Sequence, residues 1–378
     1  MQVDLLDWGV IYGKLDHRCT DDFVNTLLHV GPSLGMIVNE PKHVLKLDDD
    51  RIDTYMRALK FLKDRQIQIV VLVFPTLRTD RYTAVKYYCN VDAGMSSQVI
   101  QTYSLTKKKS LRSTVLSIAL QMNCKMGGSL WTTPNPFKSV MVVGIDVYHD
   151  TKNRSRSVVG VVSSLNQNLT HYFSQVIYQD PKQELIDGLR HCFIESIRHY
   201  FNVNNKFPAR IFVFRDGVGD GQLRTLVAYE VEQLINCFPS LTRDEVYEPK
   251  FTVVVVQKRI NTKIFAARPQ DQFENPPPGT VVDHTITKKF MYDFILVSQF
   301  AHHGTVNPTH YLVLYDNSQL KPDYLQRFTF KLCHMYFNWM GIIRVPAPCQ
   351  YAHRLAAHAG LHLKTGFHPV LAERLFYL

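Results

Sequence analysis

An uninterrupted apolar run, IVVLVF (Ile69–Phe74), lies within the segment QIVVLVFP of this 378-residue chain. A strand that is apolar on both faces is typical of a parallel sheet covered by helices on either side. Residues 51–64 place apolar side chains at helical intervals, and residues 115–128 form a helical pattern that ends in glycines. This alternation of strands and helices predicts an α/β fold.

A second α/β pattern begins after Trp131–Lys138, WTTPNPFK, whose two prolines predict a linker. Three strands are followed by a long helix from Pro181, a strand ending at Asp216, another helix, and a strand over Phe251–Arg259. This order resembles the ribonuclease H-like arrangement. The first three strands are expected at Val140–Asp150, Ser157–Asn166 and Leu169–Gln179.

The formal net charge of +10 favours a polyanionic partner such as nucleic acid. Seven scattered cysteines without a CxxC motif indicate a reducing compartment, with neither a disulfide framework nor a structural zinc site. The apolar runs are far shorter than the roughly 20 residues that cross a bilayer, so no membrane partner is expected. The start, MQVDLLDWGV, lacks a signal-peptide pattern and resembles the middle of a fold, which indicates a fragment with an added Met1.

Two aspartates interrupt apolar strands: Asp146 in VMVVGIDVYHD and Asp216 in IFVFRDGVGDGQL. A carboxylate in such a place is costly unless it is paired or bound to a metal. The first and fourth strands of a ribonuclease H-like sheet are neighbours, so the two carboxylates are expected to converge on Mg²⁺. Two such ions about 3.5–4 Å apart activate water and stabilise the leaving oxygen of a phosphodiester. The alternative for Asp216 is a turn former before Gly217.

From Phe137 onward the chain resembles the PIWI domain of Argonaute proteins, and in its details the animal Piwi clade. Many separate blocks in the same order make the resemblance specific. They are GIDVYHD (144–150), FRDGVGDGQL (214–223), VVVVQKR (253–259), PPPGTVVD (276–283), YDFILVSQ (292–299), HHGTVNPTHYLVLYDN (302–317) and VPAPCQYAHRLAAHAGLHL (345–363).

The resemblance implies a catalytic tetrad of Asp146, Glu184, Asp216 and His353. His353 would serve as a neutral nitrogen ligand. Glu184 is the best match for the glutamate, and its alternative reading is a first-turn acid of the helix from Pro181. The implied activity is a Mg²⁺-dependent endoribonuclease, with Mn²⁺ as a substitute, that leaves 5′-phosphate and 3′-hydroxyl ends.

The first half resembles a MID domain, which holds the 5′ end of a guide RNA. The resemblance implies that a tyrosine stacks on the first base and that lysines and glutamines hold the phosphate. Taken alone, Tyr82 and Lys86, four residues apart on one helix face, favour a solvated helix with a half-buried tyrosine, and the second block around Gln121 and Lys125 reverses that preference. The matching residues are Tyr82, Lys86, Gln98, Gln121 and Lys125.

Two positions depart from the Argonaute clade, which has a lysine at Gln121 and an arginine where His358 stands. In the Piwi clade a bound Mg²⁺ compensates, held by such a glutamine and by the C-terminal carboxylate, here that of Leu378. Extending the chain past Leu378 is therefore expected to weaken binding of 5′-phosphorylated RNA. Equal affinities of a tagged and an untagged form, measured with Mg²⁺ present, would contradict this expectation.

The resemblance thus predicts a Rossmann-like MID domain followed by a ribonuclease H-like PIWI domain. The boundaries are a linker segment over 1–25, MID over 26–135 and PIWI over 136–378. The predicted function is piRNA-guided cleavage of complementary RNA in transposon silencing. A guide-dependent module that recruits partners without cutting is the first alternative, and a guide-free nuclease or transposase is the second.

The implied partners are a 5′-phosphorylated guide, a target RNA and, through a longer chain, Tudor-type proteins. Cytoplasmic localisation near perinuclear germ granules is expected, with the nucleus as the alternative. The basic segment Thr106–Arg112 and the pair Lys258-Arg259 are expected to contact RNA phosphates, with a solvated surface as the alternative for Thr106–Arg112.

Overall fold

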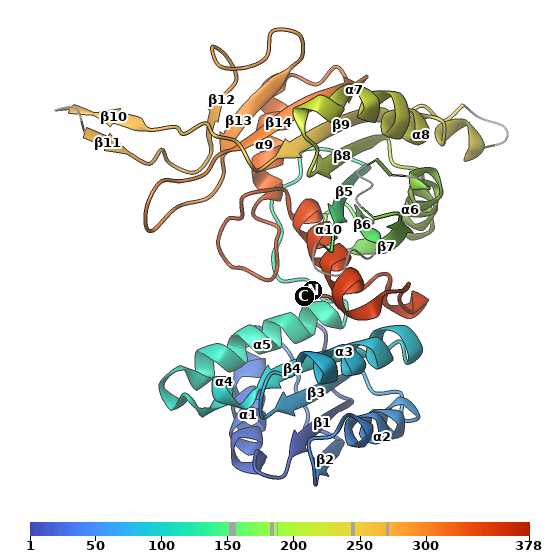
Figure 1. Cartoon of the computed structure of the whole chain (residues 1–378), viewed down its shortest axis with the longest axis vertical. Helices are drawn as coiled ribbons and strands as arrows, with labels where there is room; N and C mark the ends of the chain where they lie inside the picture. Colours follow the sequence, from blue (N-terminus) through green and yellow to red (C-terminus); the bar gives the residue numbers. More distant parts are fainter. Residues whose placement is uncertain (151–155, 182–184, 187, 243–245, 270–271) are drawn as a thin grey trace. The chain divides into compact units, whose positions relative to one another are not determined.

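The computed structural model describes residues 1–150, 156–181, 185–186, 188–242, 246–269 and 272–378 (Figure 1). The chain divides into two compact units. The first unit comprises Met1–Leu130 together with His358–Leu378, and the second unit comprises Trp131–Ala357.

The first unit is built on a parallel sheet with the strand order β2-β1-β3-β4 within the described residues. This arrangement is the Rossmann-like fold predicted from the apolar run, because all six residues of that run are buried. The strands are β1 (Trp8–Gly13), β2 (His43–Leu47), β3 (Ile69–Phe74) and β4 (Ser96–Gln101).

Helices cover both faces of this sheet. Alternate residues of β3 point to opposite sides, so Val71 packs with the α1 and α5 side chains, and Leu72 packs with those of α2 and α3. Burial on both faces explains why the strand carries no polar residue. The helices are α1 (His17–Val30), α2 (Ile52–Lys63), α3 (Thr79–Tyr87), α4 (Thr102–Thr106) and α5 (Leu111–Lys125).

The boundaries of the first unit differ from the prediction at both ends. Residues 1–25, predicted as a linker segment, contain the strand β1, which pairs with β2 and with β3. Residues 358–378, predicted as part of the second domain, pack with the first unit. Leu375, Phe376 and Tyr377 of this segment are buried, which contributes favourable free energy to the folded chain.

The second unit contains a mixed sheet with the strand order β12-β13-β14-β9-β8-β5-β6-β7 in the described part of the chain. Strands β5, β6 and β7 form the predicted antiparallel meander, whereas β8 runs parallel to both β5 and β9. The strands are β5 (Val140–Tyr148), β6 (Ser157–Ser164), β7 (Tyr172–Gln179), β8 (Arg210–Asp216), β9 (Lys250–Gln257), β12 (Thr280–Val282), β13 (Asp293–Val297) and β14 (Thr309–Asp316), with a separate hairpin of β10 (Ala266–Arg268) and β11 (Gln272–Glu274).

The helices of the second unit pack on this sheet, and Leu325, Phe328 and Leu332 of α9 join its buried core. Helix α6 begins at Leu189, after Gly188 in the left-handed region, and not at Pro181 as predicted. No helix among the described residues is long and apolar enough to cross a membrane. The helices are α6 (Leu189–Asn204), α7 (Leu223–Leu226), α8 (Glu232–Ile235), α9 (Pro322–Leu332) and α10 (Ala347–His358).

Candidate active site and anion site

The carboxyl ends of three adjacent parallel strands deliver charged side chains to one edge of the large sheet. Ile145 of β5 pairs with Arg215 of β8, so the next residues, Asp146 and Asp216, are neighbours. Strand β9 runs beside β8 and is followed by Lys258. Ligand sites of open α/β sheets commonly lie at this edge.

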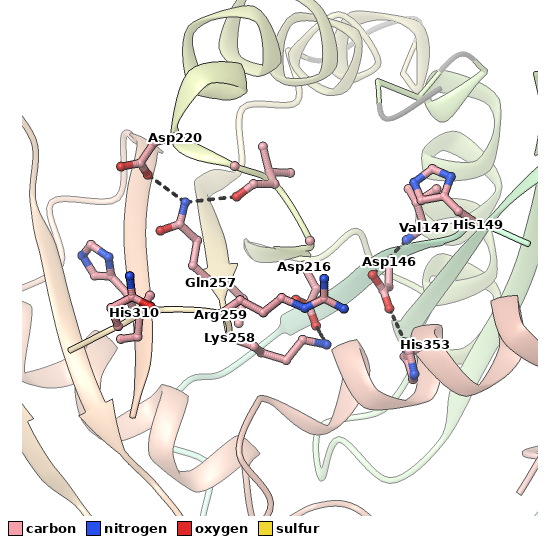
Figure 2. A pocket seen from close by; sticks show the side chains of 16 residues that line it. Asp146, Val147, His149, Asp216, Asp220, Gln257, Lys258, Arg259, His310 and His353 are labelled. Atoms are coloured by element: carbon pink, nitrogen blue, oxygen red, sulfur yellow. Dashed lines mark hydrogen bonds and ion pairs between the residues drawn. The ribbon is translucent and has the colours of Figure 1, made fainter. Parts of the chain in front are cut away.

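A pocket of about 610 Å³ occupies this edge. Figure 2 shows its charged side chains converging from different elements, with Lys258 reaching toward Asp216 and His353 toward Asp146. The residues lining the pocket include Asp146, His149, Asp216, Gly217, Asp220, Gln257, Lys258, Arg259, His310 and His353.

Asp146 is held in a fixed orientation by two hydrogen bonds. Its Oδ1 accepts from the backbone N–H of Val147 at 2.9 Å, and its Oδ2 accepts from Nδ1 of His353 at 2.7 Å. Because an ionised carboxylate only accepts hydrogen bonds, Nδ1 of His353 carries the proton. When the imidazole is neutral in this tautomer, Nε2 keeps a lone pair that can bind a cation.

Asp216 is 1% exposed, and its Oδ2 lies 2.7 Å from the Lys258 ammonium. Burial raises the pKa of Asp216 to about 6, the Asp146 charge acts in the same direction, and Lys258 opposes both. Within the described residues neither oxygen of Asp216 has a hydrogen-bond partner beyond this ion pair. The two oxygens of this buried carboxylate could therefore accept further hydrogen bonds or bind a cation.

The donor set fits a hard divalent cation. Two carboxylates from neighbouring strands and one imidazole nitrogen are ligands that Mg²⁺ and Mn²⁺ accept. Across the described residues, however, no group of three or more His, Cys, Asp and Glu side chains gathers closely enough to hold a metal ion. Glu184, the remaining predicted member, lies outside the described residues.

Two glycines shape this edge of the sheet. Gly217 has a φ of +87°, a conformation that other residues adopt with strain, and turns the chain directly after Asp216. Gly160 of β6 is the partner of Asp146 across the sheet, and a Cβ placed there would lie 2.3 Å from the backbone oxygen of Ala352 in α10. The missing side chain thus lets α10 approach closely enough for His353 to reach Asp146.

Gly160→Ala is accordingly expected to push α10 away from the sheet and to lower the free energy of unfolding by about 1–3 kcal/mol. Urea denaturation measures this change. Gly219→Ala is the matched control, because no atom lies within 4 Å of a Cβ at that position. Equal stability losses in the two variants would contradict the role assigned to the close approach.

A second polar cluster lies in the first unit, where α3, α5 and β4 meet. Nζ of Lys86 donates to the backbone oxygen of Ser97 at 3.0 Å and to its hydroxyl at 2.8 Å. Nζ of Lys125 donates to Oε1 of Gln98 at 2.9 Å, and Nε2 of Gln98 donates to Oε1 of Gln121 at 3.3 Å. The structure thus brings four of the five predicted 5′-end residues into one network.

Both lysines of this cluster are buried without an acidic partner. Lys86 and Lys125 are each 3% exposed, and neither forms an ion pair within the described residues. Burial lowers the pKa of Lys86 to about 8. Burial, reinforced by the Lys86 charge, lowers the pKa of Lys125 well below its ordinary value. Two desolvated cations side by side form a site that an anion would stabilise.

Tyr82, the fifth predicted residue, lies beside this cluster. Nζ of Lys86 is 5.7 Å from the centroid of its ring, and the His362 ring meets the Tyr82 ring edge-on at 4.9 Å. Nδ1 of His362 lies 2.9 Å from the hydroxyl of Thr83. The aromatic face and the cations are therefore close together, as recognition of a base and its phosphate requires.

His358 belongs to the same cluster and is buried. Its Nε2 lies 2.9 Å from Oδ1 of Asn90, and burial, followed by the Lys86 charge, lowers the pKa of His358 well below its ordinary value. His358 is therefore neutral near pH 7. Leu378, predicted to supply a carboxylate, forms no ion pair with either lysine within the described part of the chain.

Sequence reasoning missed His362 and the ion pair of Lys258 with Asp216. The spacing of His358 and His362, four residues apart, could have indicated one shared helix face. The ion pair leaves no local signal, because Lys258 and Asp216 meet only through the alignment of β8 with β9.

The chain is similar in sequence to proteins of a known family. The model of the Piwi domain matches residues 69–364. The chain is 46% identical over 376 residues to Piwi-like protein Ago3 of Bombyx mori and 45% identical over 372 residues to Piwi-like protein 1 of Gallus gallus. These matches cover 100% and 98% of this chain but only 40% and 42% of the relatives, so the chain spans about two fifths of their length.

Solved structures agree in fold. The crystal structure of Drosophila Piwi aligns with a TM-score of 0.91 and 32% identity, covering 99% of this chain and 51% of that one. The C-terminal lobe of a budding yeast Argonaute aligns with a TM-score of 0.85 at 22% identity, covering 100% of this chain and 86% of that one. The mixed sheet of the second unit is thus the ribonuclease H-like fold of these proteins.

Proposed function

Because the chain belongs to the Piwi domain family, we propose that it is the part of a Piwi-type Argonaute that holds a guide RNA and cuts the complementary target. The guide would be a piRNA, and the biological role would be transposon silencing. The observation that carries the cleavage proposal is the buried Asp216, which lies beside Asp146 on one pocket and whose oxygens, among the described residues, contact no donor other than the Lys258 ammonium.

In the first unit, Lys86 and Lys125 would bind the 5′-phosphate of the guide. Their ammonium groups are already desolvated and held by Ser97 and Gln98, so the phosphate gains two charge-assisted contacts with little reorganisation. Tyr82 would stack on the first base. Gln121 is the expected ligand of a Mg²⁺ shared with the Leu378 carboxylate.

In the second unit, the target backbone would enter the pocket beside Gly217, which has no side chain of its own to obstruct the approach. Asp146, Asp216 and His353 would hold Mg²⁺, which when bound lowers the pKa of water and stabilises the leaving oxygen. Asp146 also fixes the imidazole of His353 through Nδ1, so that Nε2 faces its ligand with a lone pair. Glu184 would complete the set.

The test is a cleavage assay with the chain, a 5′-phosphorylated guide, a labelled complementary target and Mg²⁺. We expect one cut, leaving 5′-phosphate and 3′-hydroxyl ends, and slower cutting with a 5′-hydroxyl guide. Asp146→Ala should bind the guide–target duplex but leave it intact. Equal product from Asp146→Ala and the wild type would refute the assignment of the active site.

A binding module that recruits silencing partners without cutting is the second candidate. The Lys258 ammonium, which already pairs with Asp216, favours this candidate. It is also favoured because no three His, Cys, Asp or Glu side chains among the described residues lie close enough together to hold a metal ion. The same assay separates the two candidates, because the binding module would retain the duplex uncut at every Mg²⁺ concentration.

The free carboxylate of Leu378 provides a separate prediction. A short C-terminal extension should weaken binding of 5′-phosphorylated RNA in Mg²⁺, because the added peptide bond removes that negative charge. The comparison is an RNA titration of tagged and untagged chains, with 5′-hydroxyl RNA as the control. A loss of affinity that is equal for both RNAs would point to general disruption and would contradict a role for the terminal carboxylate.

A further inference from the structure

Lys258 holds a position that the proposed chemistry does not use. It directly follows β9, its side chain is 30% exposed, and its ammonium lies 2.7 Å from Oδ2 of Asp216. Figure 2 shows the side chain extended across the pocket toward that carboxylate. The ammonium thus lies against one of the two carboxylates to which a divalent cation would bind.

The backbone around Lys258 is anchored on both sides. The Arg344 guanidinium donates hydrogen bonds to the carbonyl oxygens of Lys258 and, at 3.0 Å, of Pro308. On the other side, Nε2 of Gln257 donates to the carbonyl oxygen of Val218 at 3.0 Å. These bonds fix where the side chain starts, so its approach to Asp216 follows from the fold and is not a chance arrangement of a surface lysine.

The ammonium and a divalent cation compete for the same oxygen. Asp216 and Asp146 are adjacent carboxylates, and burying both charges without a cation is unfavourable. Lys258 supplies one positive charge, which relieves part of this repulsion. A divalent cation that binds Asp216 must take over Oδ2 or share it with the ammonium, and sharing places two cations in contact.

We propose that Lys258 is a built-in counter-ion of Asp216, which stabilises the metal-free pocket and is displaced when a divalent cation binds. This inference rests on the proposed metal role of Asp146 and Asp216. The proposal predicts the direction of two effects of Lys258, one on divalent-cation affinity and one on stability. The side chain weakens divalent-cation binding by the RNA-free protein and stabilises the protein when no metal is bound.

The test measures Mn²⁺ binding to the full 378-residue chain without RNA, by isothermal titration calorimetry. Lys258→Met keeps the aliphatic stem and removes the charge. We expect this variant to bind Mn²⁺ on the order of fivefold more tightly than the wild type, the size of effect that a partly exposed ion pair produces. In EDTA its melting temperature should be lower than that of the wild type, and saturating Mn²⁺ should reduce the difference.

Three variants make the result specific. Arg259→Met removes a cation that lines the same pocket but has no ion pair with Asp146 or Asp216 in the described part of the chain, so its Mn²⁺ affinity should change little. Lys258→Arg keeps the charge and should bind Mn²⁺ as weakly as the wild type, and it remains informative if Lys258→Met fails to fold. Asp216→Asn should abolish the Mn²⁺ binding that Lys258→Met tightens and thereby identify the site.

The outcomes separate this inference from the proposed function. If Asp216→Asn abolishes Mn²⁺ binding while Lys258→Met binds no more tightly than the wild type, the counter-ion role is wrong and the metal site stands. The counter-ion role is equally wrong if Arg259→Met tightens binding as much as Lys258→Met does. If Asp216→Asn binds Mn²⁺ like the wild type, both the inference and the metal role of Asp216 are wrong.

Discussion

Replacing Lys125 with methionine is expected to lower the affinity of the chain for 5′-phosphorylated guide RNA by about 30- to 100-fold. The loss of a charge-assisted contact to a phosphate is worth about 2–3 kcal/mol. The same variant should be more stable than the wild type without RNA, because Lys125 is a buried cation with no acidic partner among the described residues. Fluorescence anisotropy and urea denaturation measure the two effects.

The lowered pKa of Lys86 predicts how the free energy of unfolding and the guide affinity change with pH. The pKa of Lys86 is lowered by burial from 10.5, the ordinary value of a lysine, to about 8 in the folded protein, so the unfolded chain binds more protons between these values. The free energy of unfolding of the RNA-free protein should therefore rise with pH across this window. Phosphate binding needs the protonated lysine, and guide affinity should consequently fall as the pH rises above about 8.

Lys60→Met is the matched control, since Lys60 is exposed on α2 and the substitution is the same. It should change guide affinity by less than about twofold. A guide with a 5′-hydroxyl should bind Lys125→Met and the wild type almost equally. If Lys125→Met weakens binding of the 5′-hydroxyl guide as much as binding of the phosphorylated guide, Lys125 does not act on the phosphate.

Asp216→Asn is expected to reduce target cleavage by about a thousandfold or more, because a carboxylate ligand supplies several kcal/mol of transition-state stabilisation through its metal. The same substitution should make the metal-free protein more stable near pH 7. The ionised carboxylate is buried beside Asp146, and burial and the Asp146 charge both raise its pKa because they disfavour the charged form. A rise from 3.8 to about 6 corresponds to about 2–3 kcal/mol.

The folded protein binds the Asp216 proton more tightly than the unfolded chain does. The contribution of Asp216 to stability therefore falls as the pH rises from about 4 to about 6, and it stays reduced at higher pH. Asp216→Asn should remove this part of the pH dependence in EDTA. Asp220→Asn is the control on the same rim, because Asp220 is exposed and paired with Lys288. A stability gain in Asp220→Asn that equals the gain in Asp216→Asn would contradict the explanation.

Strands that consist of consecutive apolar residues could be predicted from the sequence. The apolar runs of β3, β5 and β8 fix these segments as strands, and the order of elements predicted that β5 and β8 are neighbours, which the pairing confirms. The fold class was predicted for the same reason. The roles of the predicted site residues stay predictions, and Glu184 lies outside the described residues.

The features that were not predicted depend on partners distant in the chain. Strand β1 is as long as β3, but its sequence WGVIYG contains Gly9 and Gly13, which weaken the strand pattern, so residues 1–25 were predicted as a linker. Helix α6 begins after Gly188, whose left-handed φ has no counterpart in apolar periodicity. The Lys258 ion pair arises from the alignment of two strands whose sequences do not reveal it.

The return of residues 358–378 to the first unit has a practical consequence for protein production. A gene segment that encodes only residues 1–130 would omit Leu375, Phe376 and Tyr377, which are buried in the folded chain and belong to that unit. Its product would expose apolar surface and lack the histidines that contact Asn90 and Thr83. Joining residue 130 through a glycine-rich connector to residue 358 would keep both segments of this unit in one chain for binding studies.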